Sequence, residues 1–213
     1  GCSRKAAEET PPPAAEAPAS AVTSSNTHTF TIGELPALAL LDGEVSFPND
    51  NKVFAVGRTP EEVAAVLAAA GLPTDALHLN VSPLLVQAGD RVLLFDTGAG
   101  GNFGPGAGNI HDALTAAGVD AQSITDIFIS HLHGDHTGGL LNDTDALAFP
   151  NARVHLSAPE WAALQKIDPE VAPNYGLPKL TQLIAAIKPR VHTFAPGADI
   201  IPGVVKAVQI DGH

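Results

Sequence analysis

The segment from Asp126 to Gly139 constrains this chain most strongly, because it joins an apolar run to a dense group of metal-binding side chains. The run Ile127–Ile129 is typical of a β-strand, and four polar residues follow it closely. They are His131, His133, Asp135 and His136. Side chains two positions apart at the end of a strand point the same way, so His131 and His133 can bind one ion together.

Asp135 and His136 follow on a turn, where the backbone can direct them toward a second ion. Imidazole nitrogen and carboxylate oxygen are ligands of zinc and similar cations, and a catalytic site keeps one position open for water. The alternative is a polar loop whose histidines are merely solvated. The density of ligands directly after an apolar strand favours a metal centre.

The length of the chain fits one domain, or one domain and a tail. The chain has 213 residues, of which 45% are hydrophobic, and its formal net charge is −12. A charge of this sign argues against binding to a phosphate backbone, which needs a basic surface. We therefore expect a small-molecule substrate and no nucleic acid. No run of about 18 apolar residues is present, so no membrane span is expected.

Residues 1–26 differ from the rest of the chain. They are rich in Ala, Pro, Glu, Ser and Thr without hydrophobic periodicity, which predicts a disordered tether before a folded domain at residues 27–213. Gly1-Cys2-Ser3 resembles the end of a bacterial lipoprotein signal, and the chain contains no methionine. This resemblance implies a removed signal peptide, a lipid on Cys2 and a place in the periplasm or cell envelope. The alternative is a cysteine without a function.

The order of patterns alternates strands and helices, which indicates an α/β fold. A Thr-Pro-x-Glu start predicts a helix from Pro60 to Ala70, and Asp42-Gly43 reads as a turn dipeptide. A second amphipathic helix is expected over Asn109–Ala117, with His111 exposed off its apolar face. Further strands are expected over 29–32, 37–41, 44–47, 81–87, 91–95, 153–156, 191–194 and 204–210, and a further helix over 180–187.

The sequence His-Leu-His-Gly-Asp-His at residues 131–136 resembles the H-x-H-x-D-H signature of the metallo-β-lactamase-fold hydrolases. The resemblance implies an αββα sandwich with two divalent metal ions, zinc being favoured, at one edge between two sheets. In that family the first two histidines hold one metal, and the Asp-His pair holds the other.

The last residues, Gly212-His213, resemble the beginning of the G-H-T-x-G-H-type element that supplies the third histidine of the first metal in this family. A catalytic zinc normally has three protein ligands, so we predict His213 as that ligand. The bridging aspartate and the last histidine would lie beyond His213. The resemblance thus implies a sandwich cut short before the end of its second half.

Three further residues are candidates for the site. Asp96 begins an Asp-Thr-Gly element that resembles one near the metals in the same family, where an Asp can orient a histidine ligand; the alternative is an Asp-led turn. Phe103 lies on a Gly-rich loop and could line a substrate pocket or simply pack that loop. Trp161, in the first turn of a helix that begins after Ser157, could form a pocket wall or belong to the core.

Within the superfamily, the chain looks most like the branch of methyl parathion hydrolase and the quorum-quenching lactonases. The matching spans are Leu94–Gly98, Asn102–Pro105 and Leu147–Ala152. This implies a hydrolase in which two cations activate a water for attack on an ester, a lactone or a phosphotriester, while Asp135 also moves a proton. Two alternatives stay open: an iron-dependent oxidoreductase like the family's sulfur dioxygenases, and a non-catalytic, lipid-tethered binding protein.

Overall fold

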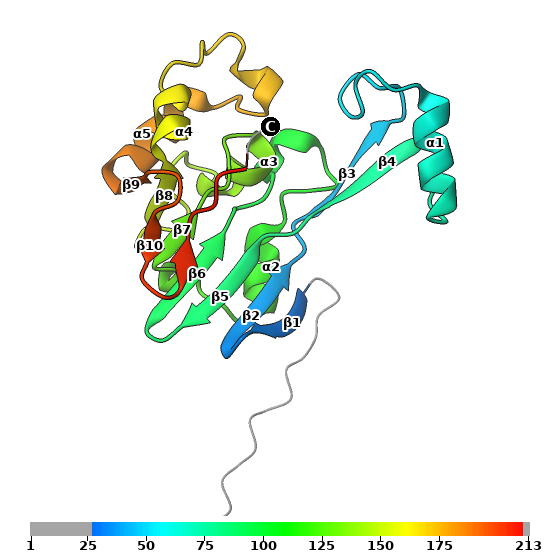
Figure 1. Ribbon diagram of the computed structural model, residues 1–213. Coiled ribbons are helices and arrows are strands. Elements are labelled where there is room, and N and C mark those ends of the chain that lie inside the picture. Colours follow the sequence, from blue (N-terminus) through cyan, green and yellow to red (C-terminus); the bar gives the residue numbers. More distant parts are fainter. Residues whose placement is uncertain (1–26, 211–213) are drawn as a thin grey trace, which may run out of the picture.

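The computed structural model describes residues 27–210 of the 213. A sheet of seven strands organises this part of the chain (Figure 1). In their order across the sheet the strands are β1 (Thr27–Ile32), β2 (Leu35–Leu40), β5 (Leu84–Ala88), β6 (Arg91–Phe95), β7 (Asp126–Phe128), β8 (Arg153–Ser157) and β9 (Val191–Phe194). Each neighbouring pair from β1 to β6 is antiparallel. Each neighbouring pair from β6 to β9 is parallel. The predicted tether with Cys2, and the predicted ligand His213, lie outside the described residues.

Helices lie on one face of this sheet and on a separate arm (Figure 1). The α-helices are α1 (Pro60–Ala69), α2 (Ile110–Ala116), α3 (Gly134–Thr137), α4 (Ala158–Leu164) and α5 (Leu180–Ile187). The 3-10 turns are η1 (Gly100–Phe103), η2 (Ala121–Ser123), η3 (Gly138–Leu140), η4 (Ala172–Tyr175) and η5 (Lys188–Arg190). Buried residues of α2, α4 and α5 pack with the strands β6, β7 and β8 into the largest core cluster. Within residues 27–210, no helix has the length and apolarity needed to cross a membrane.

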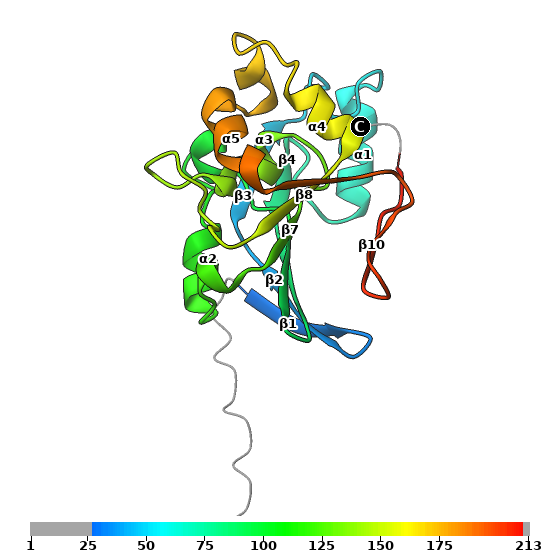
Figure 2. The same ribbon diagram turned by 90° about the vertical axis from the view of Figure 1, so that its left-hand side faces the viewer.

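The other face of the sheet carries a smaller cover. A hairpin of β10 (Asp199–Ile201) and β11 (Val205–Lys206) lies on the opposite side from α2 and α5 (Figure 2). Ile201 belongs to a second cluster with Phe128 and Leu93 from the sheet. The two faces of the parallel strands are therefore both apolar, as strands covered on both sides require.

The parallel arrangement of β6, β7 and β8 decides where the site forms. Their register pairs Leu94 with Ile127 and Ile127 with Val154. Parallel strands end at the same edge of a sheet, so the residues that follow β6 and β7 meet there. Asp96 comes directly after β6, and the histidine cluster comes after β7.

An arm projects from the sheet between β2 and β5. It consists of the antiparallel strands β3 (Gly43–Pro48) and β4 (Ala76–Val81), joined through α1 (Figure 1). The predicted start of α1 is confirmed, because Thr59 and Glu62 form a reciprocal capping box and Pro60 occupies the first turn. No residue of α1 is buried. The arm therefore extends away from the main core, and Val45 near its base packs with Ala99 and Ala107 in a separate small cluster.

Two predicted strands were wrong in extent. The strand expected over 81–87 is interrupted, with Val81 in β4 and Leu84 in β5, because Pro83 between them has no N–H to donate. The strand expected over 204–210 shrinks to β11, and Val208 and Ile210 are 76% and 86% exposed. Only β10 pairs with β11 among the described residues, so the alternating pattern beyond Lys206 has no partner strand there.

The buried carboxylate of Asp42 joins three parts of the fold. Oδ2 accepts hydrogen bonds from the backbone N–H groups of Ala99 (3.0 Å) and Gly108 (2.8 Å), and Oδ1 accepts one from Ile110 (2.9 Å). The side chain is fully buried. The expected turn at Asp42-Gly43 was therefore wrong. Gly43 begins β3 with a positive φ of 151°. Because glycine has no Cβ, the backbone of Gly106 can approach it closely, where a Cβ would collide.

A second buried polar group lies on β7. Asp126 accepts hydrogen bonds from His155 Nε2 (2.8 Å) and Thr125 Oγ1 (2.8 Å), and Arg91 Nη1 lies 3.3 Å from it. Burial alone would raise the pKa of Asp126, but the bonds from His155 and Thr125 lower it below 3.8. Burial lowers the pKa of His155 despite the neighbouring carboxylate. At neutral pH an uncharged His155 thus donates to a charged Asp126.

We predict that Asp42→Ala lowers the free energy of unfolding by about 3 kcal/mol, because three backbone N–H donors lose their acceptor together. In urea titrations the midpoint should fall while the slope m stays constant. Asp90→Ala, at an exposed turn position, serves as the control and should change the midpoint little. Equal midpoints for both variants would contradict the role assigned to Asp42.

Asp126→Asn is expected to lower the free energy of unfolding at pH 7 by about 1–3 kcal/mol. Because the folded pKa of Asp126 lies below its unfolded value near 3.8, its contribution is present above pH 3.8 and is lost as the pH falls through the folded pKa. The difference between wild type and variant should therefore narrow below pH 3.8. Urea titrations at several pH values measure it, with the exposed Asp199→Asn as the control.

Candidate metal centre

His131 and His133 lie in the turn between β7 and α3, and their rings converge. His131 Nε2 is 3.0 Å from His133 Nδ1, with the two ring planes at 87°. Two ligands at about 2.1 Å from one zinc ion and at a tetrahedral angle are about 3.4 Å apart. At 3.0 Å the two nitrogens are in hydrogen-bond contact, close to the spacing that a shared ion would require.

Asp135 and His136, within α3, form a second pair beside the first. His136 Nε2 lies 3.5 Å from Asp135 Oδ2, and the rings of His131 and His136 have centroids 4.0 Å apart. Within residues 27–210, no three His, Cys, Asp or Glu side chains group around a single point as the ligands of one ion. The arrangement is two adjacent pairs, each of which would need further ligands. The donor set itself, imidazole and carboxylate, fits zinc and similar cations.

The structure places Asp96 against His136. Asp96 Oδ2 lies 2.7 Å from His136 Nδ1, so the other ring nitrogen, Nε2, is the one that faces Asp135. Asp96 also accepts hydrogen bonds from Ser130 N (2.8 Å) and Ser130 Oγ (2.9 Å). A carboxylate that holds one nitrogen of an imidazole orients the other toward a metal. Ser130 was not singled out from the sequence, and only its position directly before His131 could have indicated it.

The electrostatics of this group favour positive charge. Burial alone would lower the pKa of His136, but hydrogen bonds to Asp135 and Asp96 raise it to about 9. The pKa of Asp135 is lowered, because the contacts with His136 outweigh the effect of its burial. Two carboxylates that stabilise a cationic imidazole in this way also suit a bound metal cation.

The backbone around the cluster is packed closely. Thr97, fully buried, donates from N and Oγ1 to the carbonyl oxygen of His136 at 2.8 and 2.9 Å. A Cβ at position 134 would collide with the carbonyl of Gly176. Glycine is therefore required at position 134, where α3 begins against this neighbouring segment. These contacts fix the ligand-bearing turn relative to the loop that follows β6.

The predicted ligands open into a pocket of about 720 Å³. Its walls include all four ligands of the cluster, Asp96, Phe103 and hydrophobic side chains of the arm. Tyr175, whose ring lies nearly parallel to that of His133 at 6.2 Å, also lines it. Sequence reasoning missed Tyr175, although it is the only tyrosine of the chain. Trp161 does not line this pocket, because it packs against the main core cluster.

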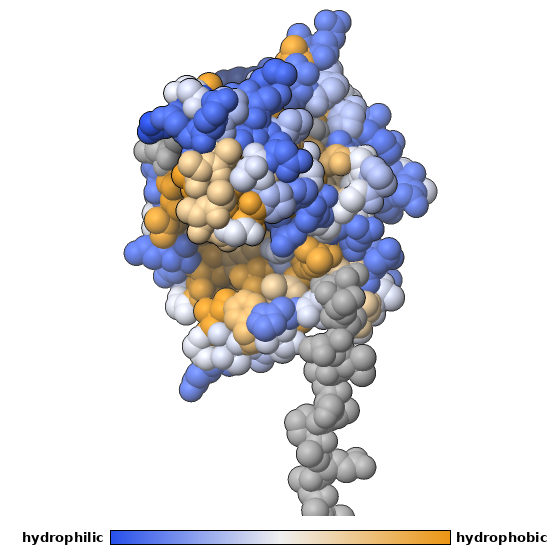
Figure 3. All heavy atoms as spheres, turned by 90° about the vertical axis from the view of Figure 1, so that its right-hand side faces the viewer, coloured by the Kyte–Doolittle hydropathy of each residue, from blue (hydrophilic) through white to orange (hydrophobic). Residues whose placement is uncertain are grey.

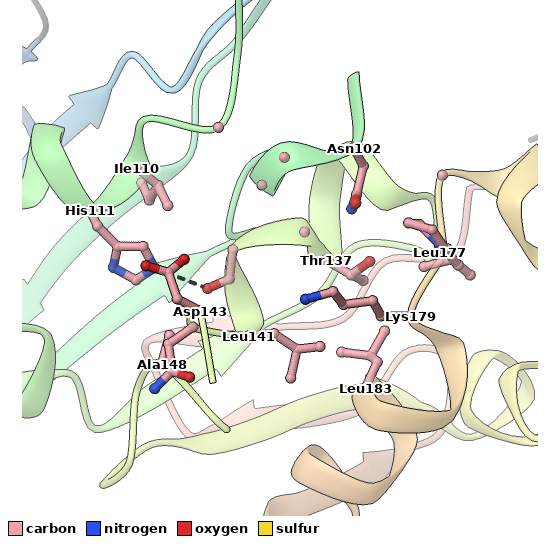
Figure 4. Close-up of a pocket in the computed structure, with 18 residues that line it drawn as sticks. Asn102, Ile110, His111, Thr137, Leu141, Asp143, Ala148, Leu177, Lys179 and Leu183 are labelled. Carbon is pink, nitrogen blue, oxygen red and sulfur yellow. Dashed lines mark hydrogen bonds between the residues drawn. The ribbon is translucent and has the colours of Figure 1, made fainter. Parts of the chain in front are cut away.

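A second pocket of similar volume lies beside Thr137 and the residues that follow it (Figure 4). Its walls include Thr137, Lys179 and His111, but none of the predicted ligands. His111 is half-buried, with Nε2 at 3.2 Å from the carbonyl of Gly139 and its ring stacked on Phe149. The expectation that His111 would be exposed was wrong, because the turn after α3 covers it. This pocket has no part in the candidate metal centre.

Comparison with known proteins decides the family. Residues 78–213, more than half of the chain, match the metallo-beta-lactamase superfamily. The chain belongs to the metallo-β-lactamase superfamily. The large sheet with its covering helices agrees with this fold, so the predicted fold class is confirmed.

Similar proteins within the superfamily differ in how much they share with this chain. The structure resembles AidC, a dizinc quorum-quenching lactonase in complex with a product N-hexanoyl-L-homoserine, with a TM-score of 0.74 and 27% identity over 83% of this chain and 63% of AidC. It resembles the hydrolase AbOPH with a TM-score of 0.67 and 26% identity over 84% of this chain and 64% of AbOPH. Ribonuclease Z of Salinibacter ruber (strain DSM 13855 / M31) is 42% identical over 72 residues, 34% of this chain.

The chain spans less than two thirds of each of these relatives, and only 19% of ribonuclease Z. The likeness to AidC confirms the predicted branch of the superfamily.

We predict that the full-length protein binds zinc, and that the double change His131→Ala, His133→Ala removes one ion per chain. Asp96→Asn, which weakens the hold on His136, should lower zinc affinity by about 10–100-fold. Calorimetric titration of the metal-free protein measures both effects. His28→Ala, an exposed residue of β1, is the control, and unchanged zinc binding in the double variant would contradict the ligand assignment.

Proposed function

We propose that this protein is a metal-dependent hydrolase that acts on a small ester, lactone or phosphotriester. The observation that carries the proposal is the convergence of two ligand pairs in one pocket, at the edge where β6 and β7 end. The likeness to AidC and AbOPH, both more than 25% identical to this chain, supports hydrolysis. Two zinc ions are the cofactors we propose.

The residues of the chain have separate roles in this proposal. His131 and His133 would hold one ion, and His136 with Asp135 would hold the other, while His213, outside the described residues, is proposed as a further ligand of the first. When bound, divalent cations lower the pKa of water and polarise the bond that it attacks. Asp96 keeps the ring of His136 oriented.

Asp135 is suited to move a proton. Its carboxylate lines the pocket, with Oδ2 at 3.5 Å from His136 Nε2. A charged carboxylate in this position can accept a proton from the attacking water and deliver it to the leaving group.

The acidity of the chain supports a small substrate over a nucleic acid. A formal net charge of −12 repels a phosphate backbone. The similarity to ribonuclease Z extends over only 72 residues. We therefore propose that the substrate of that enzyme is not the substrate of this chain.

Removal of metal should abolish hydrolysis of esters and lactones by the full-length protein, and added zinc should restore it. His131→Ala with His133→Ala should lower kcat/KM by more than the roughly 10–100-fold that loss of an outer partner costs. Activity that survives both treatments would refute the proposal. Bound iron together with oxygen uptake would favour the oxidoreductase alternative, and His28→Ala is again the control.

A further inference from the structure

The pocket beside Thr137 is separate from the candidate metal centre, and the proposed function does not use it. Its volume is about 720 Å³, within the range of small-molecule sites, and none of the candidate metal ligands lines it. Its walls come from separate parts of the chain: the Gly-rich loop after β6, the start of α2, the turn and loop after α3, and the segment that leads into α5. The groups on these walls decide which class of ligand the pocket fits.

One side of this pocket is apolar. Ile110, Leu177 and Leu183 line it, and each side chain is at most 5% exposed. Hydrophobic residues also gather around a hollow on the arm side of the molecule (Figure 3). The pocket beside Thr137 differs from an apolar hollow, because polar side chains form much of its remaining wall. They are Asn102, His111, Asn142, Asp143 and Lys179. A ligand that fills this pocket therefore needs both a hydrocarbon part and a polar group.

His111 supplies a hydrogen-bond acceptor to this wall. Its Nε2 lies 3.2 Å from the carbonyl oxygen of Gly139, a contact marked by the dashed line in Figure 4. A carbonyl oxygen can only accept, so Nε2 carries the proton, and Nδ1 of the neutral ring has a lone pair. The ring stacks on Phe149, with centroids 5.2 Å apart and planes at 27°. The acceptor thus belongs to a ring that is held on both sides.

The charged side chains of the pocket leave one carboxylate in excess. Lys179 Nζ forms an ion pair with Asp145 Oδ1. Within residues 27–210, no lysine, arginine or histidine pairs with Asp143. The formal net charge of −12 adds to the negative potential around this carboxylate. An unpaired carboxylate and an imidazole acceptor in one pocket favour a cationic donor over an anion.

The loop that carries Asp143 is closed by its own hydrogen bonds. Asn142 Oδ1 accepts from Thr144 N at 2.9 Å and from Ala146 N at 3.1 Å. The ion pair with Lys179 joins the same loop to the start of α5. The carboxylate therefore has a defined place at the pocket before any ligand binds, which lowers the cost of binding.

We propose that this pocket binds a small organic cation: a primary ammonium group on a hydrocarbon body, such as an alkylamine or arylalkylamine. The ammonium group would donate to Asp143 and His111, while the hydrocarbon body packs on the apolar side. Like the side chain of lysine, with a pKa of about 10.4, such an amine is protonated at pH 7. The inference does not rest on the proposed function, because it uses neither the metal ions nor the residues assigned to hydrolysis.

The test compares hexylammonium, hexanol and hexanoate, which carry similar hydrocarbon chains and differ in charge. Each is titrated into the zinc-loaded, full-length protein at pH 7, and NMR chemical shifts give the dissociation constants. Hexylammonium should bind most tightly, and Asp143→Asn should weaken its binding by roughly fivefold, the contribution of an exposed ion pair. Hexanol binding should not change. Asp90→Asn removes the same charge from an exposed turn outside the pocket and is the matched control.

A second variant tests the acceptor. His111→Phe keeps a ring that can stack on Phe149 and removes Nδ1, so it should weaken the binding of hexylammonium and leave that of hexanol unchanged.

Methyl signals locate the bound cation. Those of Leu141, Leu177 and Leu183 should shift, whereas those of Val45 and Leu79, which line the pocket of the candidate metal ligands, should not. Any of three results would overturn the inference: no binding of hexylammonium, tighter binding of hexanoate, or shifts confined to the pocket of the metal ligands. Equal effects of Asp143→Asn and Asp90→Asn would do the same. None of these results bears on metal-dependent hydrolysis, so the proposed function stands or falls separately.

Discussion

The carboxylate of Asp42 is the interaction on which the rest of the site depends. It binds three backbone N–H groups that lie 57 to 68 residues further along the chain, and so fixes the Gly-rich loop after β6 and the start of α2 at the end of β2. That loop in turn holds the ligand-bearing turn, because Thr97 binds the carbonyl of His136 and Gly98 accepts a hydrogen bond from Gly138 N. Because the acceptor is fully buried, the loss of these bonds would leave the donors without water to replace it.

The same network orients the candidate ligands. Asp96 and Ser130 hold His136 from one side, and the glycine at position 134 allows the turn to pack directly on the backbone of Gly176. The supporting contacts are made by backbone and short side chains, which have little freedom to move. Candidate ligands held in this way would need little rearrangement to bind a metal ion, and a preformed site has a higher affinity for its ion for this reason.

The sequence predicted those parts of the fold that depend on neighbouring residues. The strand before the histidine cluster and the capping box of Thr59 are local patterns, and both appear in the structure. The role of Asp42 and the position of Tyr175 depend on partners far along the chain, which no local pattern reveals. Trp161 could be placed on a helix from sequence, but its packing against the core depends on how that helix lies on the sheet. The strand expected at 204–210 fails for a similar reason, since an alternating pattern forms a strand only beside a partner.

The arm leaves and re-enters the sheet at a single point. Leu40 N binds the carbonyl of Pro83 and Asp42 N binds that of Val81, each at 2.9 Å, while β2 pairs directly with β5 as if the residues between them were absent. An insertion closed at its base in this way can change in length or sequence without disturbing the register of the main sheet. Residues 43–81 can therefore vary while the strand order that positions the candidate metal centre at the ends of β6 and β7 stays the same.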